Sequence, residues 1–318
     1  MTSADSVSFK KLALISIGLI ALALATYGAG VTYGFVFDDL KTIVHNSGLE
    51  RGTAWADLLS SRYYIHSGEN TYRPLVTASY ILEHSLFGKT PGVFHLTNII
   101  LHSLNSALFF LFAFMIFRNL GWAAFSAAFF AVHPAASEAI NGISFREDLL
   151  MATFGFVALL AGQRFLVAQR PGRWAWLAVS AIALLASCLS KESGIVVPVI
   201  LAAGIIANLI GKPDSRFRQS LPLFLALFLV CVLYLFIWAV WMKNPASKHP
   251  ALLGGSWFTV FFNIPLVYLH HIKTLHWPFN LSAQYTFQPA TSLGLHSALA
   301  AFAFVALLAF TTWLLLKK

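Results

Sequence analysis

Acidic or basic side chains occur near the ends of apolar segments at four points in a chain that is otherwise poor in charge. In chain order these are Asp38-Asp39, Arg73, Arg146-Glu147-Asp148 and Lys191-Glu192. A carboxylate can take a proton from a hydroxyl group, and cationic side chains can hold a phosphate as it leaves. Arginine suits phosphate because its planar fork donates two parallel hydrogen bonds. Residues of these types are those that group transfer from a phosphate-linked donor requires.

The roles within this set are assigned only in part by the sequence. Asp38 or Asp39 could serve as the base, and the sequence does not separate them. The candidate phosphate clamps are Arg73, Arg146 and Lys191. The alternative is that these charges, which lie at the ends of apolar segments, are interfacial anchors and ion pairs. Charges near the membrane interface cost less free energy than charges at a helix centre, so this alternative stays open.

The elements that must position these residues are membrane helices. The chain is 58% hydrophobic and 10% charged, with a mean hydropathy of +0.74, whereas soluble domains carry about a quarter charged residues. Apolar stretches near the bilayer-spanning length of about 20 residues recur along it. We therefore predict an all-α polytopic membrane protein of about eight transmembrane helices. The predicted spans are 12–35, 94–117, 122–143, 149–168, 174–190, 193–210, 219–242 and 294–316.

Two further segments complete one predicted domain over residues 1–318. Residues 38–93 form the long hydrophilic stretch and are expected to be the first extracytoplasmic loop. Within it, Thr53 to Ser61 and Pro74 to Phe87 are predicted as amphipathic helices along the membrane surface. Residues 257–292 are predicted as a re-entrant or interfacial segment, aromatic over 257–275, followed by a loop.

The distribution of lysine and arginine sets the expected orientation. With a cytoplasmic N-terminus, eleven basic and two acidic residues fall inside, against ten of each outside. The net charge of +9 then lies on the cytoplasmic side, as the positive-inside rule prefers. The basic pI therefore reflects topology and does not indicate nucleic acid binding. Cys188 and Cys231 lie in apolar runs and support neither a disulfide framework nor a metal cluster.

Polar residues also occur inside the predicted spans. In the second span His95, Asn98, His102 and Asn105 recur at intervals of 3, 4 and 3, which places them on one helical face. Such a stripe avoids lipid and faces other helices or a wet cavity. Hydrogen bonding between helices would suffice to explain it.

The third span repeats this pattern near its outer end. His133, Ser137 and Asn141 lie on one side with Glu138 beside them, and Pro134 is expected to kink the helix. With this topology the polar faces meet in the outer third of the membrane, beside the two aspartates. A cavity there suits a substrate that is half lipid and half polar, such as a polyprenyl-phosphate sugar.

Six stretches carry a family resemblance. In order they are FVFDDLKTIVHN, TYRPLV, GVFHLTNIILHSLNSALFF, FAVHPAASEAINGISFREDLL, LSKESGI and WPFNLSAQYTF. The chain resembles, over roughly residues 30–290, the membrane part of the transmembrane and tetratricopeptide-repeat protein O-mannosyltransferases and their bacterial relatives. These are GT-C glycosyltransferases. One departure is that the family's R-A-D reads Arg146-Glu147-Asp148 here, with an extra negative charge.

The resemblance implies an integral-membrane transferase that moves a sugar, with mannose the first candidate, from a polyprenyl-phosphate donor to a hydroxyl acceptor with inversion. The acceptor would be a protein Ser or Thr, a lipid or a glycan, and a bacterial inner membrane with an extracytoplasmic active site is expected. The implied acidic motif is Asp38-Asp39, in which Asp39 is slightly favoured as the base although the two are not separated. The implied substrate-binding positions are Arg73, His133, Glu138, Arg146, Asp148, Lys191 and Glu192, to which we add His95 and His102 from the polar stripe.

Other interpretations remain at this stage. His270, His271 and His276 could hold a divalent metal together with one of the aspartates, but hydrogen-bonded anchoring is the commoner role of such histidines. A transporter or channel would use the polar faces as a path, but no repeated half is found. A non-catalytic scaffold with an enzyme's fold is the remaining alternative.

Overall fold

The computed structural model describes most of the chain and resolves it into helices. The described residues are 7–50, 54–60, 62–67, 69–168, 172–209, 214–242, 252, 255–279, 281–282, 285, 288–292 and 294–316, and these contain no strand. Two compact units, Met1–Pro245 and Ala246–Lys318, are described below separately. The prediction of an all-α protein is confirmed.

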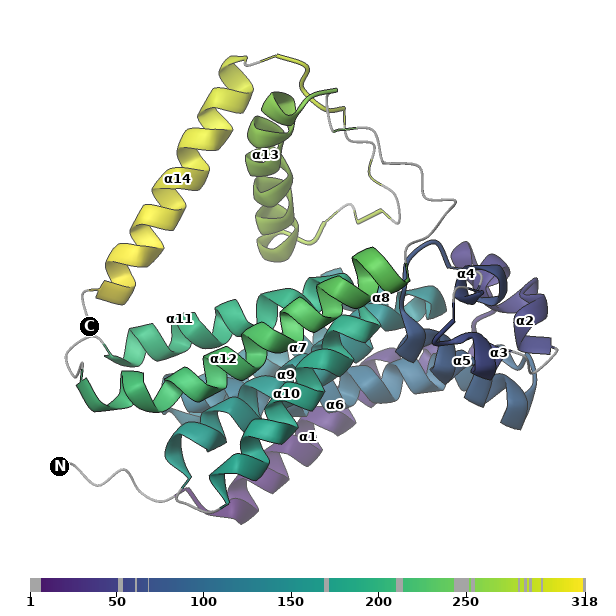
Figure 1. The fold of residues 1–318 in the computed structure, drawn as a ribbon, viewed down its shortest axis with the longest axis horizontal. Helices are drawn as coiled ribbons and strands as arrows, with labels where there is room; N and C mark the ends of the chain where they lie inside the picture. The colour runs from purple at the N-terminus through teal and green to yellow at the C-terminus, as the bar shows by residue number, and fades with distance from the viewer. Residues whose placement is uncertain are drawn as a thin grey trace. The chain divides into compact units, whose positions relative to one another are not determined.

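A bundle of helices that lie side by side makes up most of the first unit (Figure 1). They are α1 (Phe9–Tyr27), α6 (Pro91–Phe117), α7 (Leu120–Val132), α9 (Arg146–Val167), α10 (Arg173–Ser190), α11 (Val197–Leu209) and α12 (Asp214–Phe236). The chain between α1 and α6 contains η1 (Gly28–Thr32), η2 (Leu40–Val44), α2 (Ser47–Glu50), α3 (Ala54–Asp57), α4 (Tyr63–His66) and α5 (Pro74–Phe87). Of these, α2 to α5 lie together near one end of the bundle (Figure 1). The predicted loop 38–93 therefore folds into helical pieces.

Among the residues that the structure describes, five helical segments are long and apolar enough to cross a membrane. They are Phe9–Thr32, Pro91–Phe117, Ile143–Val167, Arg173–Ser190 and Ser220–Trp241. A sixth is counted if α7 and Pro134–Asn141, bent by 49°, form one span. The protein is thus an integral membrane protein with several spans. The predicted spans at 193–210 and 294–316 are also helical, but the apolar stretches found there, Glu192–Gly204 and Ser297–Phe310, are shorter. Eight crossings stay a prediction.

Helix α9 packs closely against its neighbours through small residues. A Cβ atom on Gly155 would lie 3.2 Å from a Val197 methyl, and one on Gly162 would lie 3.0 Å from a Leu201 methyl, so α9 approaches α11 closely at both glycines. Ser180 and Ser187 of α10 donate hydrogen bonds to backbone oxygens of α9. Small residues at a helix interface allow the contacts that hold membrane helices together.

The third predicted span is broken where Pro134 ends α7. The chain continues through η3 (Pro134–Ala136), α8 (Ser137–Asn141) and η4 (Ile143–Phe145) before α9 begins. Such a break frees backbone oxygens, which must find partners in a membrane. The polar stripe of α6, His95, Asn98, His102 and Asn105, supplies partners for two of these oxygens. His102 Nε2 bonds Ala131 O at 3.0 Å, and Asn98 Nδ2 donates to Gly142 O at 3.1 Å.

The fourth residue of the stripe also bonds a backbone oxygen, here one inside α9, because Asn105 Nδ2 donates to Leu149 O at 2.9 Å. The polar face of α6 therefore faces other helices, which is one of the two expectations raised by its spacing. The hydrogen bonds from Asn98 and Asn105 hold the chain at the start of α9, where several candidate site residues lie.

The second unit contains α13 (Trp257–His276) and α14 (Leu295–Leu316). Ser256 and Thr259 form a capping box at the start of α13. The two helices contact each other, with the Tyr268 and Phe304 rings 5.4 Å apart. The predicted aromatic segment 257–275 is therefore a continuous helix, and its re-entrant or interfacial placement stays a prediction.

Candidate functional site

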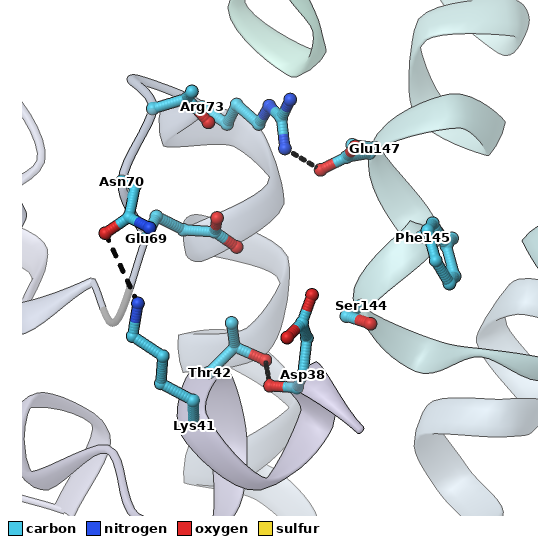
Figure 2. A pocket seen from close by; sticks show the side chains of 10 residues that line it. Asp38, Lys41, Thr42, Glu69, Asn70, Arg73, Ser144, Phe145 and Glu147 are labelled. Carbon is cyan, nitrogen blue, oxygen red and sulfur yellow. Dashed lines mark hydrogen bonds and ion pairs between the residues drawn. The ribbon is translucent and has the colours of Figure 1, made fainter. Parts of the chain in front are cut away.

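A polar cavity of about 240 Å³ opens between the first loop and the start of α9. Figure 2 shows side chains from both sides pointing toward it. Its lining consists of Asp38, Lys41, Thr42, Glu69, Asn70, Thr71, Arg73, Ser144, Phe145 and Glu147. It thus brings together residues from 38–42, 69–73 and 144–147, which are far apart in the sequence.

Asp38 is presented to this cavity by an unusual backbone turn. Phe37 has a φ of 47°, a left-handed conformation that costs free energy in a bulky residue. A hydrogen bond to the backbone stabilises this turn, because Thr42 Oγ1 donates to Asp38 O at 2.9 Å. The Asp38 side chain is exposed, and its carboxylate forms no hydrogen bond or ion pair with another residue that the structure describes. It is therefore free to meet a substrate.

Asp39 lies in a different environment although it is the next residue. It is fully buried, and both of its carboxylate oxygens accept backbone hydrogen bonds. Oδ2 accepts from Val36 N at 3.1 Å and Oδ1 from Ser144 N at 2.7 Å. The Asp39 carboxylate therefore ties the first loop to η4 and holds the turn that presents Asp38.

An ion-pair network borders the cavity at the start of α9. Arg73 pairs with Glu147 and with Glu192, the latter at 3.2 Å. Lys191 pairs with Glu147 at 3.0 Å and with Asp148 at 2.7 Å. Glu147 therefore joins the cation before α5 to the cation after α10. Four of the predicted residues, Arg73, Asp148, Lys191 and Glu192, are brought together in this network.

Glu69 is a cavity residue that the sequence did not single out. Burial, and next the charge of Glu147, raise the pKa of its carboxyl group from 4.5 to about 7. The carboxylate has no hydrogen bond or ion pair to another described residue. Its backbone N–H donates to Ser67 Oγ at 3.1 Å, which fixes the turn that carries it.

Arg146 lies away from the cavity, in the interior between α5, α6 and α9. Its side chain has no exposed surface. It donates to Glu83 Oε2 at 2.7 Å and to Asn98 Oδ1 at 2.8 Å, with further bonds to Ser79 Oγ and Phe94 O. The guanidinium also lies over the Tyr80 ring at 4.7 Å. We therefore interpret Arg146 as a positioning residue, in place of the phosphate ligand expected from its type.

The histidines among the predicted residues do not line the cavity. His95 Nε2 lies 3.3 Å from Gly34 O, His102 bonds Ala131 O, and His133 Nδ1 accepts from Ala135 N at 3.1 Å. Glu138 is exposed on α8 and is not part of the lining. Within the described part of the chain, no three histidine, cysteine or acidic side chains come together as metal ligands.

The residues missed by sequence reasoning are polar loop residues of ordinary type. They are Lys41, Glu69, Asn70 and Ser144, together with Glu147, which was noted only as an extra charge. A glutamate in a hydrophilic loop carries no signal of burial. For Glu147 the sequence did offer a signal of a place in the site, because it lies between the predicted site residues Arg146 and Asp148.

The curated proteins that this chain is similar to include several protein O-mannosyl-transferases. The chain is 29% identical over 273 residues to the human protein O-mannosyl-transferase TMTC2, covering 77% of this chain and 32% of that protein. It is 30% identical over 281 residues to Drosophila melanogaster Tmtc2, covering 81% and 30%, and 36% identical over 147 residues to mouse TMTC1, covering 44% and 16%. The resemblance inferred from the motifs is thereby confirmed.

The chain spans about a third or less of the length of the curated relatives it matches. No family model and no solved structure matches it.

Proposed function

We propose that this protein is a membrane glycosyltransferase that moves a sugar, with mannose the first candidate, from a polyprenyl-phosphate donor to a hydroxyl acceptor. The printed names of its relatives, protein O-mannosyl-transferases, support the sugar-transfer reaction and a protein acceptor. The observation that carries the proposal is a free carboxylate, Asp38, in one polar cavity with Lys41 and Arg73.

Asp38 is the proposed base of the reaction. It takes the proton of the acceptor hydroxyl, whose oxygen forms the new bond to the sugar as the bond from the sugar to phosphate breaks. Asp39 is the proposed positioning residue, because its two oxygens are already bound by Val36 N and Ser144 N. Asp39 is also fully buried and does not line the cavity, so an acceptor in the cavity is out of its reach, and a base must be within hydrogen-bond reach of the proton that it takes.

The donor phosphate is proposed to bind beside Arg73 and Lys41. Lys41 Nζ is steadied by Asn70 Oδ1 at 3.3 Å, and Arg73 is held by Glu147 and Glu192. Cations that are held in place before the reaction stabilise a leaving phosphate without reorganisation. Lys191 is bonded to Glu147 and Asp148, so its proposed role is to orient Glu147.

The cavity is proposed to lie on the extracytoplasmic side of the membrane, a bacterial inner membrane being expected. The loop 38–93 then faces away from the side that carries the excess of lysine and arginine. A polyprenyl chain in the outer leaflet would reach the cavity while the acceptor enters from water.

The test is incubation of the purified protein with a panel of polyprenyl-phosphate sugars and a Ser/Thr peptide, scoring release of polyprenyl phosphate. Release with one sugar and incorporation of that sugar into the peptide or another hydroxyl acceptor is the expected result. Transport of a solute by the reconstituted protein, with no release from any donor, would contradict the proposal in favour of a transporter.

A further inference from the structure

Glu69 is a half-buried acid of the cavity that the proposed reaction leaves without a role. Figure 2 shows its carboxylate pointing into the cavity, between the Arg73–Glu147 pair and Asp38. The charged and titratable groups around it come from every neighbouring element. They are Asp38 and Lys41 from the first loop, Tyr63 of α4, Arg73 before α5, Tyr80 of α5 and Glu147 of α9.

The cations nearest to Glu69 are engaged elsewhere. Arg73 is paired with Glu147 and Glu192, and Lys41 is hydrogen-bonded to Asn70. Glu69 itself has neither a hydrogen bond nor an ion pair from its carboxylate within the described part of the chain. A half-buried carboxylate without a partner is unfavourable when ionised.

The cavity's charge depends on this one proton. Its lining contains the acids Asp38, Glu69 and Glu147 and the bases Lys41 and Arg73. With Glu69 ionised the lining sums to −1, and with Glu69 protonated it sums to zero. An anion entering the cavity therefore meets less repulsion when Glu69 carries its proton.

We propose that Glu69 is a donor-binding residue that is protonated in the donor complex, where its O–H donates a hydrogen bond to the donor, so that binding of the anionic phosphodiester takes up a proton. The inference rests on the proposed function, because it assumes a phosphate-linked donor in this cavity. No covalent bond changes in this step. One proton moves from solvent to the Glu69 carboxylate as the donor binds.

The direction of the pH dependence follows from linkage. The free protein holds Glu69 with a pKa of about 7, and the donor's negative charge raises that pKa further. Below pH 7 Glu69 is already protonated and donor affinity is at its full value. Above pH 7 a proton must be taken up on binding, so affinity falls as pH rises, by about tenfold between pH 7 and pH 8.5.

The experiment is a calorimetric titration of the full chain in lipid nanodiscs with a short-chain polyprenyl phosphomannose. This phosphodiester carries the same single charge across the pH range used. Glu69→Gln is always neutral and can still donate a hydrogen bond. We expect it to bind the donor with nearly pH-independent affinity, and at pH 8.5 to bind more tightly than the wild type. A gain in affinity is a result that a misfolded variant does not give.

The matched control is Asp57→Asn, a buried acid of the same loop whose carboxylate accepts from Ser60 Oγ and does not line the cavity. It should keep the wild-type pH dependence. Wild-type titrations in two buffers of different ionisation enthalpy should show net proton uptake near pH 7.5, which tests the inference even if Glu69→Gln fails to fold. Donor binding without proton uptake would overturn this inference alone. Absence of donor binding at every pH would contradict the proposed function as well.

Discussion

At the scale of single residues, the acids of the site divide by whether their oxygens are already bound. Asp39 and Glu147 have both oxygens engaged, Asp39 by backbone N–H groups and Glu147 by Arg73 and Lys191. Asp38 and Glu69 have no such partners in the described part of the chain. A base must be within hydrogen-bond reach of the proton that it takes, and the exposed Asp38 in the cavity lining meets this condition whereas the buried Asp39 does not.

The sequence identified the aspartate pair but could not separate its members. The separation depends on Ser144 N, which lies 105 residues further along the chain and meets Asp39 only in the folded state. The same limit applies to Arg146. Its residue type fits a phosphate clamp, but Glu83, Asn98 and the ring of Tyr80 enclose it in the bundle.

The first prediction concerns Arg146. Arg146→Ala leaves the Glu83 carboxylate without its ion-pair partner in the interior, and removing one partner of a buried pair costs about 3–5 kcal/mol of stability. We expect a loss of this size in the free energy of unfolding, measured by denaturant titration in detergent. Arg62→Ala, at an exposed arginine of the same loop, should cost less than about 0.5 kcal/mol. A fully stable Arg146→Ala protein that no longer binds donor would instead assign Arg146 to the phosphate.

At the scale of elements, the polar stripe of α6 was predictable and its partners were not. The spacing of His95, Asn98, His102 and Asn105 places them on one face whatever surrounds the helix. What they bind depends on the break at Pro134, because that break frees the Ala131 and Gly142 oxygens. Sequence reasoning expected a kink at Pro134, but the path through η3, α8 and η4 is set by tertiary contacts.

The second prediction concerns the contact between α6 and η1, which precedes the acidic turn. A Cβ atom on Gly92 would lie 2.7 Å from Val31 O, closer than real Cβ contacts allow. Gly92→Ala should therefore destabilise the protein by about 1–3 kcal/mol through overpacking. In Gly18→Ala, where nothing lies within 4 Å, the helix should be unaffected or stabilised by up to about 1 kcal/mol. Equal thermal midpoints for the two variants would show that α6 does not pack against Val31 in this way.

At the scale of the whole molecule, hydropathy predicted where helices form better than how many cross the membrane. Helices occur at all eight predicted spans, because an apolar segment in lipid must satisfy its own backbone hydrogen bonds. The count depends on the bent pair at Pro134 and on the shorter apolar stretches at Glu192–Gly204 and Ser297–Phe310. Length and composition are insufficient for such segments.

The third prediction tests the orientation on which the site's placement depends. Ser85 on α5 and Lys11 at the start of α1 are both exposed. In intact cells, Ser85→Cys should react with an impermeant thiol reagent added outside, whereas Lys11→Cys should react only after permeabilisation. The native Cys188 is buried and Cys231 is half-buried inside helices, so background labelling should be low. The reverse labelling pattern would place the cavity on the cytoplasmic side.

The central claim is that the Asp38 carboxylate takes the acceptor's proton while Asp39 holds the loop. The most direct test is single-turnover release of polyprenyl phosphate by Asp38→Asn, with donor affinity measured on the same sample. We predict release at least about 100-fold slower than wild type, unchanged thermal stability and retained donor binding. Asp57→Asn should release at the wild-type rate. Release by Asp38→Asn at the wild-type rate would contradict the account.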